Sequence, residues 1–326
     1  MKRMIWILLG LLGFVAIAFA VLLFVTHTPP EVRATITDDT SLPRLRGADV
    51  MLHGRIIGPE DAPLTIVLHG GPGNDHRSLL GLEKLTDSHR ILFYDQRGAG
   101  LSERVTPEQL DIAHHLADLD QLIEEHARNA PVTLLGHSMG ATMAVAYMGH
   151  APDRVKQAIL IEPGFLDMSG YEAFEARRIK LSRSPRVIWA GILAGFRARG
   201  VTTDTYAAHD SIVGAAVHAF ANHPDNPYHC GNGYTAPSWR FGGIASDTFW
   251  ADVGPTMDAV KSGLSFEGPI MFMAGECNYW IGPNLQPKHA ARFANAELKI
   301  VADAGHDVIW DQPDQAIGMI REFLER

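Results

Sequence analysis

Two short motifs contain side chains that together could attack a carbonyl group. Gly136-His137-Ser138-Met139-Gly140 follows an apolar run and precedes a stretch with helical spacing, which is where a serine nucleophile sits on a sharp strand-to-helix turn. The flanking glycines leave room for that turn, so the Ser138 hydroxyl would project from its tip. His306, in Ala304-Gly305-His306-Asp307, follows the last apolar run and could act as the base that a serine hydroxyl needs.

The negative charge that develops on a substrate oxygen needs hydrogen-bond donors, and the sequence offers two backbone N–H groups. One belongs to Met139, at the start of the helix predicted after Ser138. The other belongs to Gly71 in the glycine-rich segment His69-Gly70-Gly71-Pro72-Gly73. A phosphate-binding loop is disfavoured here, because the Lys-Ser/Thr ending of such loops is missing.

The elements that must position these motifs alternate along the chain. Near-continuous apolar runs predict strands, and stretches with apolar residues on one helical face separate several of them. This pattern indicates the α/β class, with a mostly parallel sheet covered on both faces and an antiparallel entry hairpin from residues 49–57. The predicted strands span 64–69, 90–95, 132–136, 155–162, 269–275 and 297–302, and the helices 107–128, 139–150, 286–293 and 313–324.

A long interruption of this alternation predicts an inserted helical cap. Residues 164–266 contain helical stretches but no convincing strand, and they separate a first core part (49–163) from a second (267–326). An insertion at this place would fold over the strand ends where open α/β sheets bind ligands. Within it, the run at 187–196 (VIWAGILAGF) favours a helix buried in the cap, with an acyl pocket or a bilayer contact as alternatives.

The amino-terminal segment is apolar enough to cross a membrane. Residues 4–25 carry no charged side chain, and at about 1.5 Å per residue they match a hydrocarbon core of about 30 Å. We predict a single-pass anchor over residues 1–27 and an extended tether over 28–48, in preference to a cleaved signal peptide. Lys2 and Arg3 would hold the amino terminus in the cytoplasm and place the body on the outer, periplasmic or extracellular side.

Composition argues against nucleic acid as a partner and against a fold stabilised by disulfides or a metal ion. The chain of 326 residues has 28 Lys plus Arg against 37 Asp plus Glu, a net charge of -9, so nucleic acid is not an expected partner. Cys230 and Cys277 are too few for a disulfide scaffold, although they could pair outside the cytoplasm. The histidines of the cap match no zinc pattern, and neither a metal nor a cofactor is expected.

The motifs HGGPG (69–73), DQRGAGLS (95–102), GHSMG (136–140) and DAGH (303–306), in this order, resemble the α/β-hydrolase fold. They are most similar to its proline iminopeptidase branch, over about residues 51–326. The resemblance implies a Ser-His-acid hydrolase that cleaves esters, amides or N-terminal peptide bonds of small molecules or short peptides. Recognition of a free α-amine would need carboxylates in the cap, for which Asp167, Glu172 and Glu175 are candidates.

The sequence departs from this family at the acid of the triad. The family places an aspartate three residues after a glycine that ends a strand, but here Gly275 is followed at that spacing by Asn278. An amide can orient an imidazole but cannot stabilise the imidazolium by charge. Glu162, directly after the strand predicted over 155–162, is the preferred acid, with Glu276 and Asn278 as alternatives. The competing hypothesis is a catalytically impaired protein that uses the fold for binding.

Overall fold

A computed structural model describes residues 2–326, with side chains from Arg3 onward; Met1, the first residue of the predicted anchor, and the Lys2 side chain lie outside this part. Eight strands form one sheet in the order β1-β2-β4-β3-β5-β6-β7-β8. β2 pairs antiparallel with both β1 and β4, and the other neighbouring strands pair parallel, which confirms the predicted α/β-hydrolase fold class. The antiparallel entry hairpin begins before residue 49, because its first strand is β1. The strands are β1 Arg44–Arg46, β2 Met51–Ile57, β3 Leu64–Leu68, β4 Arg90–Tyr94, β5 Val132–His137, β6 Val155–Ile161, β7 Ile270–Gly275 and β8 Ala296–Val301.

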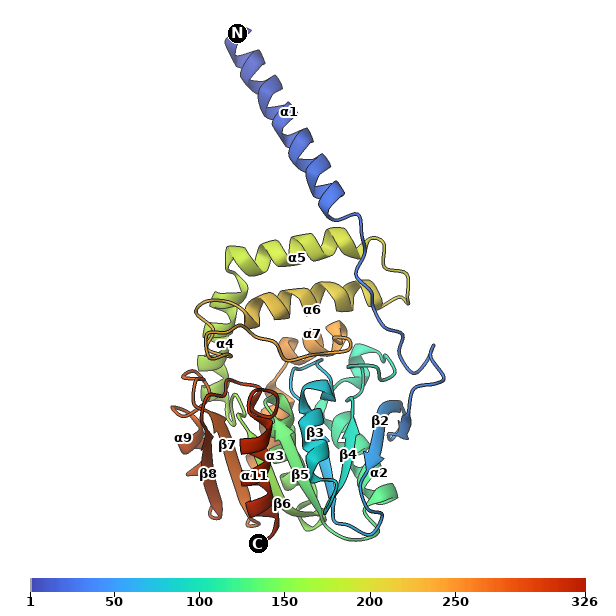
Figure 1. Cartoon of the computed structure of the whole chain (residues 1–326), viewed down its shortest axis with the longest axis vertical. Helices are drawn as coiled ribbons and strands as arrows, with labels where there is room; N and C mark the ends of the chain where they lie inside the picture. Colours follow the sequence, from blue (N-terminus) through green and yellow to red (C-terminus); the bar gives the residue numbers. More distant parts are fainter. Residues whose placement is uncertain (1) are drawn as a thin grey trace.

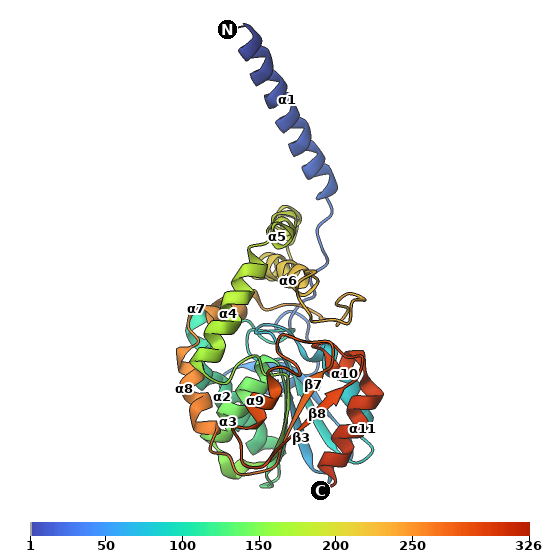
Figure 2. The same cartoon turned by 90° about the vertical axis from the view of Figure 1, so that its left-hand side faces the viewer.

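Helices cover both faces of the sheet because the inner strands are apolar on both sides. In β3, Ile66 and Leu68 pack toward one cluster of buried residues and Val67 toward the other. The predicted helix over 107–128 is divided into a short η2 and the helix α2, which begins after the N-cap residue Asp111. One face carries α2 Ile112–His126, α3 Met139–His150 and α8 Gly254–Gly263, and the other η1 His76–Leu85, α10 Val308–Asp311 and α11 Pro313–Leu324 (Figure 2). The remaining short helices are η2 Pro107–Gln109, η3 Pro152–Arg154 and α9 Gln286–Ala290.

The inserted segment places its helices above the strand ends that carry the motifs. These are α4 Met168–Ser182, α5 Pro185–Ala198, α6 Ala207–Ala221 and α7 Gly243–Ala251 (Figures 1 and 2). The segment predicted as the cap, 164–266, also includes α8, which packs on α3 with Gly263 against the Val145 carbonyl. No strand separates α8 from the cap helices, so the sequence contains no signal that distinguishes this core helix from them.

A buried ion-pair network joins the cap to the core. Asp210 of α6 is 2% exposed, and its carboxylate lies 3.0 Å from Arg104, in the loop after β4, and 2.8 Å from Arg240. Arg240 also pairs with Asp204 at 2.6 Å. Breaking a buried pair by removing one partner costs several kcal/mol, so this network fixes the cap over the strand ends.

The amino-terminal helix α1, Lys2–Val25, projects away from the body (Figure 1). The most apolar 18-residue window of its segment Arg3–Val25 has a mean hydropathy of 3.0 and no buried residues, so the length and composition suit either a membrane span or a signal sequence. The region predicted as an extended tether, 28–48, is instead partly folded, because residues 44–46 form β1 and Ile36 is buried with its N–H donating to the Leu101 carbonyl at 2.9 Å.

Candidate active site

Ser138 lies on a strained turn between β5 and α3. Its φ of 54° falls in the left-handed region that ordinary side chains avoid. The turn is possible because a Cβ on Gly136 would lie 2.5 Å from the Ala141 Cα, and one on Gly140 would strike the Leu68 carbonyl. The two glycines therefore serve the sharp turn expected from the sequence, and α3 directs its first N–H groups toward the serine.

His306 lies on the loop between β8 and α10 and is paired with a buried carboxylate. Its Nδ1 is 2.7 Å from Oε2 of Glu162, the first residue after β6. Glu162 is fully buried and has a φ of 47°, so its backbone too is held in a left-handed conformation. The Gly275 N–H donates to Oε1 at 2.9 Å and the Asn278 side-chain amide donates to Oε2 at 2.7 Å.

The other two residues considered for the triad acid, Glu276 and Asn278, have different partners. Glu276 is exposed, and its carboxylate accepts a hydrogen bond from the Asp303 N–H at 3.3 Å. Asn278 occupies the position of the family aspartate, but its amide contacts Glu162 and no hydrogen bond joins it to His306 within the described residues. The structure therefore brings together His306 and Glu162, with Asn278 as a donor to that glutamate.

Burial dominates the electrostatics of this pair. It lowers the pKa of His306 below its ordinary value of 6.5, while the nearby Asp307 and Asp311 carboxylates oppose the shift. Burial also raises the pKa of Glu162, and the hydrogen bonds from Gly275 and Asn278 act against that rise by stabilising the carboxylate. The imidazole is consequently neutral near pH 7, which is the form that can accept a proton from a serine hydroxyl.

Two residues that hold the His306 ring and its loop were not foreseen from the sequence in this role. The Tyr228 ring stacks on the imidazole at a centroid distance of 4.3 Å, and the Tyr228 carbonyl accepts the His306 N–H at 3.1 Å. In addition, Nε2 of His137 donates to the His306 carbonyl at 2.9 Å. His137 stood within the GHSMG motif, but Tyr228 lies in an irregular cap segment without a motif that would signal it.

A cavity of about 690 Å³ opens above these residues, and Ser138, His306 and Gly71 all line it. Gly71 has a φ of 131°, which its lack of a side chain permits. The Met139 N–H lies in the first turn of α3, directly after Ser138. Both predicted oxyanion donors thus lie in segments that adjoin the serine.

The wall of the cavity is mostly apolar and comes from the cap. Phe174, Val213, Phe220 and Trp250 are among the lining side chains. None of the three cap carboxylates considered for amine recognition lines it. Asp167 pairs with Arg292 at 2.6 Å, Glu175 pairs with Arg178, and Glu172 is exposed.

The only carboxylate among the described lining residues is Asp247. It lies 2.8 Å from Nε2 of His209 and is therefore already partnered. The cavity consequently suits an apolar group better than a free amine.

A disulfide joins the cap to the loop that carries Asn278. Cys230 and Cys277 are bonded and lie 47 residues apart in the chain. Cys230 follows the Tyr228 segment that contacts His306, and the Cys277 N–H donates to the Ala304 carbonyl at 2.9 Å. The bond therefore connects two segments that contact His306 or its loop.

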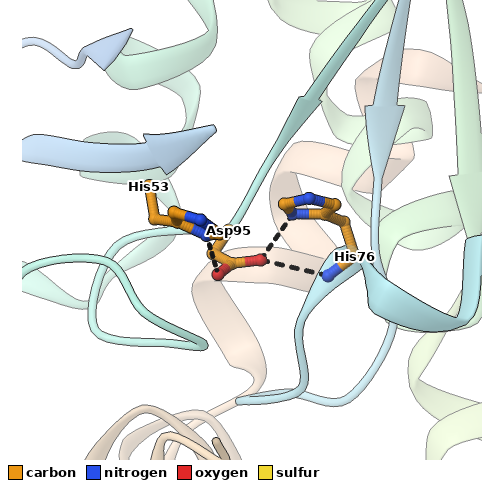
Figure 3. Close-up of side chains that lie close together, drawn as sticks. All are labelled: His53, His76 and Asp95. Atoms are coloured by element: carbon orange, nitrogen blue, oxygen red, sulfur yellow. Dashed lines mark hydrogen bonds and ion pairs between the residues drawn. The ribbon is translucent and has the colours of Figure 1, made fainter. Parts of the chain in front are cut away.

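A second buried cluster, around Asp95 of the DQRGAGLS motif, is a scaffold. Nδ1 of His53 and Nδ1 of His76 each lie 2.7 Å from a different oxygen of the Asp95 carboxylate (Figure 3). Burial opposes ionisation of Asp95, but His76 and His53 hold its pKa below the usual range. Backbone N–H groups of His76 and Leu101 also donate to the carboxylate, so its oxygens are already satisfied without a metal ion.

Comparisons with known proteins agree with this architecture. The alpha/beta hydrolase fold family matches residues 63–313. A proline iminopeptidase from Heyndrickxia coagulans is 43% identical over 104 residues, which span 30% of this chain and 34% of that protein. The proline iminopeptidase PfmaB from Pestalotiopsis fici is 27% identical over 288 residues, covering 83% of this chain and 95% of PfmaB.

Solved structures share the fold at lower identity. A proline iminopeptidase-related protein from Thermus thermophilus superposes with a TM-score of 0.62 at 22% identity, covering 87% of this chain and 96% of that one. An esterase from Thermogutta terrifontis gives 0.59 at 20% identity, covering 87% and 98%. The chain therefore belongs to the alpha/beta hydrolase fold family, as a proline iminopeptidase-like member.

Proposed function

We propose that the protein is a membrane-anchored serine hydrolase that cleaves an ester or amide of an apolar acyl group. The observation that carries this proposal is the Glu162–His306 pair at 2.7 Å beside the strained Ser138 turn, in a shared cavity with an apolar wall. In this proposal, α1 spans the bilayer with its amino terminus in the cytoplasm and the body outside. The Cys230–Cys277 disulfide supports an oxidising outer compartment.

The roles follow from the positions of the groups. The Ser138 oxygen forms a bond to the substrate carbonyl carbon, and His306 accepts the hydroxyl proton. Glu162 stabilises the imidazolium, while the N–H groups of Met139 and Gly71 stabilise the oxyanion. His306 then returns the proton to the leaving group, which departs as the acyl-enzyme forms. Water, activated by His306, subsequently hydrolyses that ester.

Cleavage of an N-terminal residue from a peptide is the second candidate. Asp247 in the cavity wall is the observation that favours it, because this carboxylate could bind an α-amine after giving up His209. Comparison of prolyl and alanyl amides with acyl esters of similar size separates these substrates. The hypothesis of an impaired binding protein rested on Asn278, and the Glu162 carboxylate at His306 supplies the charge that an asparagine lacks.

A fluorophosphonate probe tests the proposed nucleophile. We expect the full-length protein to be labelled, and the label to map to Ser138, because an activated serine reacts with this probe through its oxygen. Ser138→Ala is the matched control and should remain unlabelled. A correctly folded protein that takes up no label would support the binding hypothesis instead.

The pH dependence tests His306. Its lowered pKa predicts that kcat/KM for an uncharged ester rises with pH, with a midpoint below 6.5. The activity rises with pH because the neutral imidazole is the active form, and the midpoint is lowered because burial favours that neutral form. A midpoint above 6.5, measured on the full-length protein in detergent, would contradict this description of the site.

A further inference from the structure

The outer face of cap helix α5 is apolar and exposed, contrary to the buried helix expected from its sequence. Ile188, Trp189 and Ile192 are 51%, 54% and 41% exposed, and the half-buried Phe196 continues the same stripe. At 100° per residue these four side chains fall within about one third of the helix circumference. An apolar stripe of this kind, facing outward from a folded domain, indicates an interaction surface.

The position of α1 indicates what covers this stripe. The Phe19 ring of α1 meets the Phe196 ring of α5 at a centroid distance of 6.1 Å. α5 is the outermost body helix at the end where α1 leaves, and it runs across the direction of α1 (Figures 1 and 2). Phe19 precedes Val25, the end of α1, by six residues, or about 9 Å along the helix. Amphipathic helices lie about 5–10 Å deep in a bilayer surface, so a spanning α1 would place α5 at that depth.

The segment after α1 is attached to the cap, which restricts how α5 can turn relative to α1. The Thr203 hydroxyl, in the loop after α5, donates to the Val32 carbonyl at 3.0 Å. The buried Arg240 guanidinium donates to the Arg33 carbonyl at 2.9 Å. Both contacts lie within eight residues of the end of α1. The exit of α1 and the orientation of α5 are therefore coupled.

The charge around α5 complements an anionic lipid surface. Between Glu175 and Asp204 the chain has seven basic residues and no acidic one, although its overall net charge is -9. Four of these side chains are exposed near the two ends of α5, namely Arg183, Arg186, Arg197 and Arg199. Each basic residue near an anionic membrane contributes about 1 kcal/mol of attraction. Arginine at both ends of an apolar stripe with Trp and Phe is typical of an interfacial helix.

The catalytic cavity reaches this same helix. Val187, Ile188 and Gly191 of α5 line the cavity that contains Ser138 and His306. Ile188 is also half exposed, so it borders both the cavity and the outer face. A substrate chain that leaves the bilayer beside α5 would enter the cavity along an apolar wall that is continuous with the stripe.

We propose that α5 lies in the surface of an anionic bilayer and that the cavity takes the long acyl chain of a membrane-dissolved substrate. The proposal rests on the serine hydrolase activity proposed above and adds the substrate class and its route. Apolar contact between α5 and lipid places the cavity against the acyl chains, so productive binding of a long-chain substrate depends on the stripe. A short, water-soluble ester reaches Ser138 without it.

The test uses the full-length protein in nanodiscs of phosphatidylcholine and phosphatidylglycerol, with 4-methylumbelliferyl oleate and 4-methylumbelliferyl acetate as substrates of equal leaving group. The variant Trp189→Glu/Ile192→Glu changes two side chains of the stripe that do not line the cavity. We expect kcat/KM to fall by about tenfold or more for the oleate and by less than about twofold for the acetate. Ile300→Glu, on the exposed part of edge strand β8, is the matched control and should leave both values unchanged.

An equal effect on the two esters, or an oleate loss no larger than that of Ile300→Glu, would overturn the proposal. Quenching of tryptophan fluorescence by doxyl-labelled lipid tests the location of α5 without turnover. The wild type should lose more fluorescence than Trp189→Phe, with the difference due to Trp189. Equal quenching would overturn the proposal, whereas greater quenching without hydrolysis of either ester would leave α5 at the membrane and contradict only the proposed enzyme activity.

Discussion

Glu162→Gln is expected to lower kcat by about 10⁴, the effect of an acid-to-amide change in a serine triad. The amide keeps the shape of the side chain but removes the charge that stabilises the imidazolium of His306, and its NH₂ group can force the ring into the wrong tautomer. The measurement is steady-state turnover of a p-nitrophenyl ester by the full-length protein. Thermal unfolding of the same sample shows whether the fold is retained.

Two further substitutions assign the acid among the candidates from the sequence. Glu276→Gln should change kcat by less than about twofold, because this exposed carboxylate contacts the Asp303 N–H and not the histidine. Adding Asn278→Asp to Glu162→Gln should restore part of the lost activity, since it returns a carboxylate to the position used by the family. Loss of turnover in Glu276→Gln with full activity in Glu162→Gln would reverse the assignment.

Removal of the Cys230–Cys277 disulfide is expected to lower the free energy of unfolding by about 2–4 kcal/mol, as for bonds that close loops of this size. The bond closes a loop of 47 residues, and Tyr228, which contacts His306, lies two residues before Cys230. Cys230→Ser/Cys277→Ser should therefore unfold at a lower temperature and also turn over its substrate more slowly. The chain has only these two cysteines, so dithiothreitol should destabilise the wild type and leave the double variant unchanged.

Thiol counting by mass spectrometry of protein purified without reductant supplies the direct measurement. A bonded pair is expected if the body faces an oxidising compartment, because such bonds do not persist in the reducing cytoplasm. Two free thiols in freshly isolated membranes would argue against the outer location of the body.

The sharp turn at Ser138 was predictable because its requirements are local. Gly136, Ser138 and Gly140 lie within five residues, and the steric need for two glycines is already present in the sequence. The strands were predictable for the same reason, since burial on both faces demands near-continuous apolar runs. Their boundaries agree with the structure to within about one residue, because turn residues follow the runs directly.

Contacts between distant segments could not be predicted in this way. Glu162 and His306 are separated by 144 positions, and only the parallel order of β6, β7 and β8 brings their loops to one edge. Sequence reasoning could name the glutamate as a candidate, but it could not exclude Glu276, which follows the neighbouring strand. The donor role of Asn278 toward Glu162 depends on the same arrangement.

The environment of α5 shows most clearly the difference between what local sequence determines and what the tertiary structure determines. The sequence by itself determined that residues 187–196 form an apolar segment between basic ones, because composition and helical spacing are local properties. It did not determine which way the apolar face points. The tertiary structure decided this, because the small residues Ala194 and Ala198 are buried while Trp189 and Ile192 remain exposed. The hydrophobic effect favours removal of an apolar surface from water but has no direction, so only the fold decides which side of the helix is buried against protein.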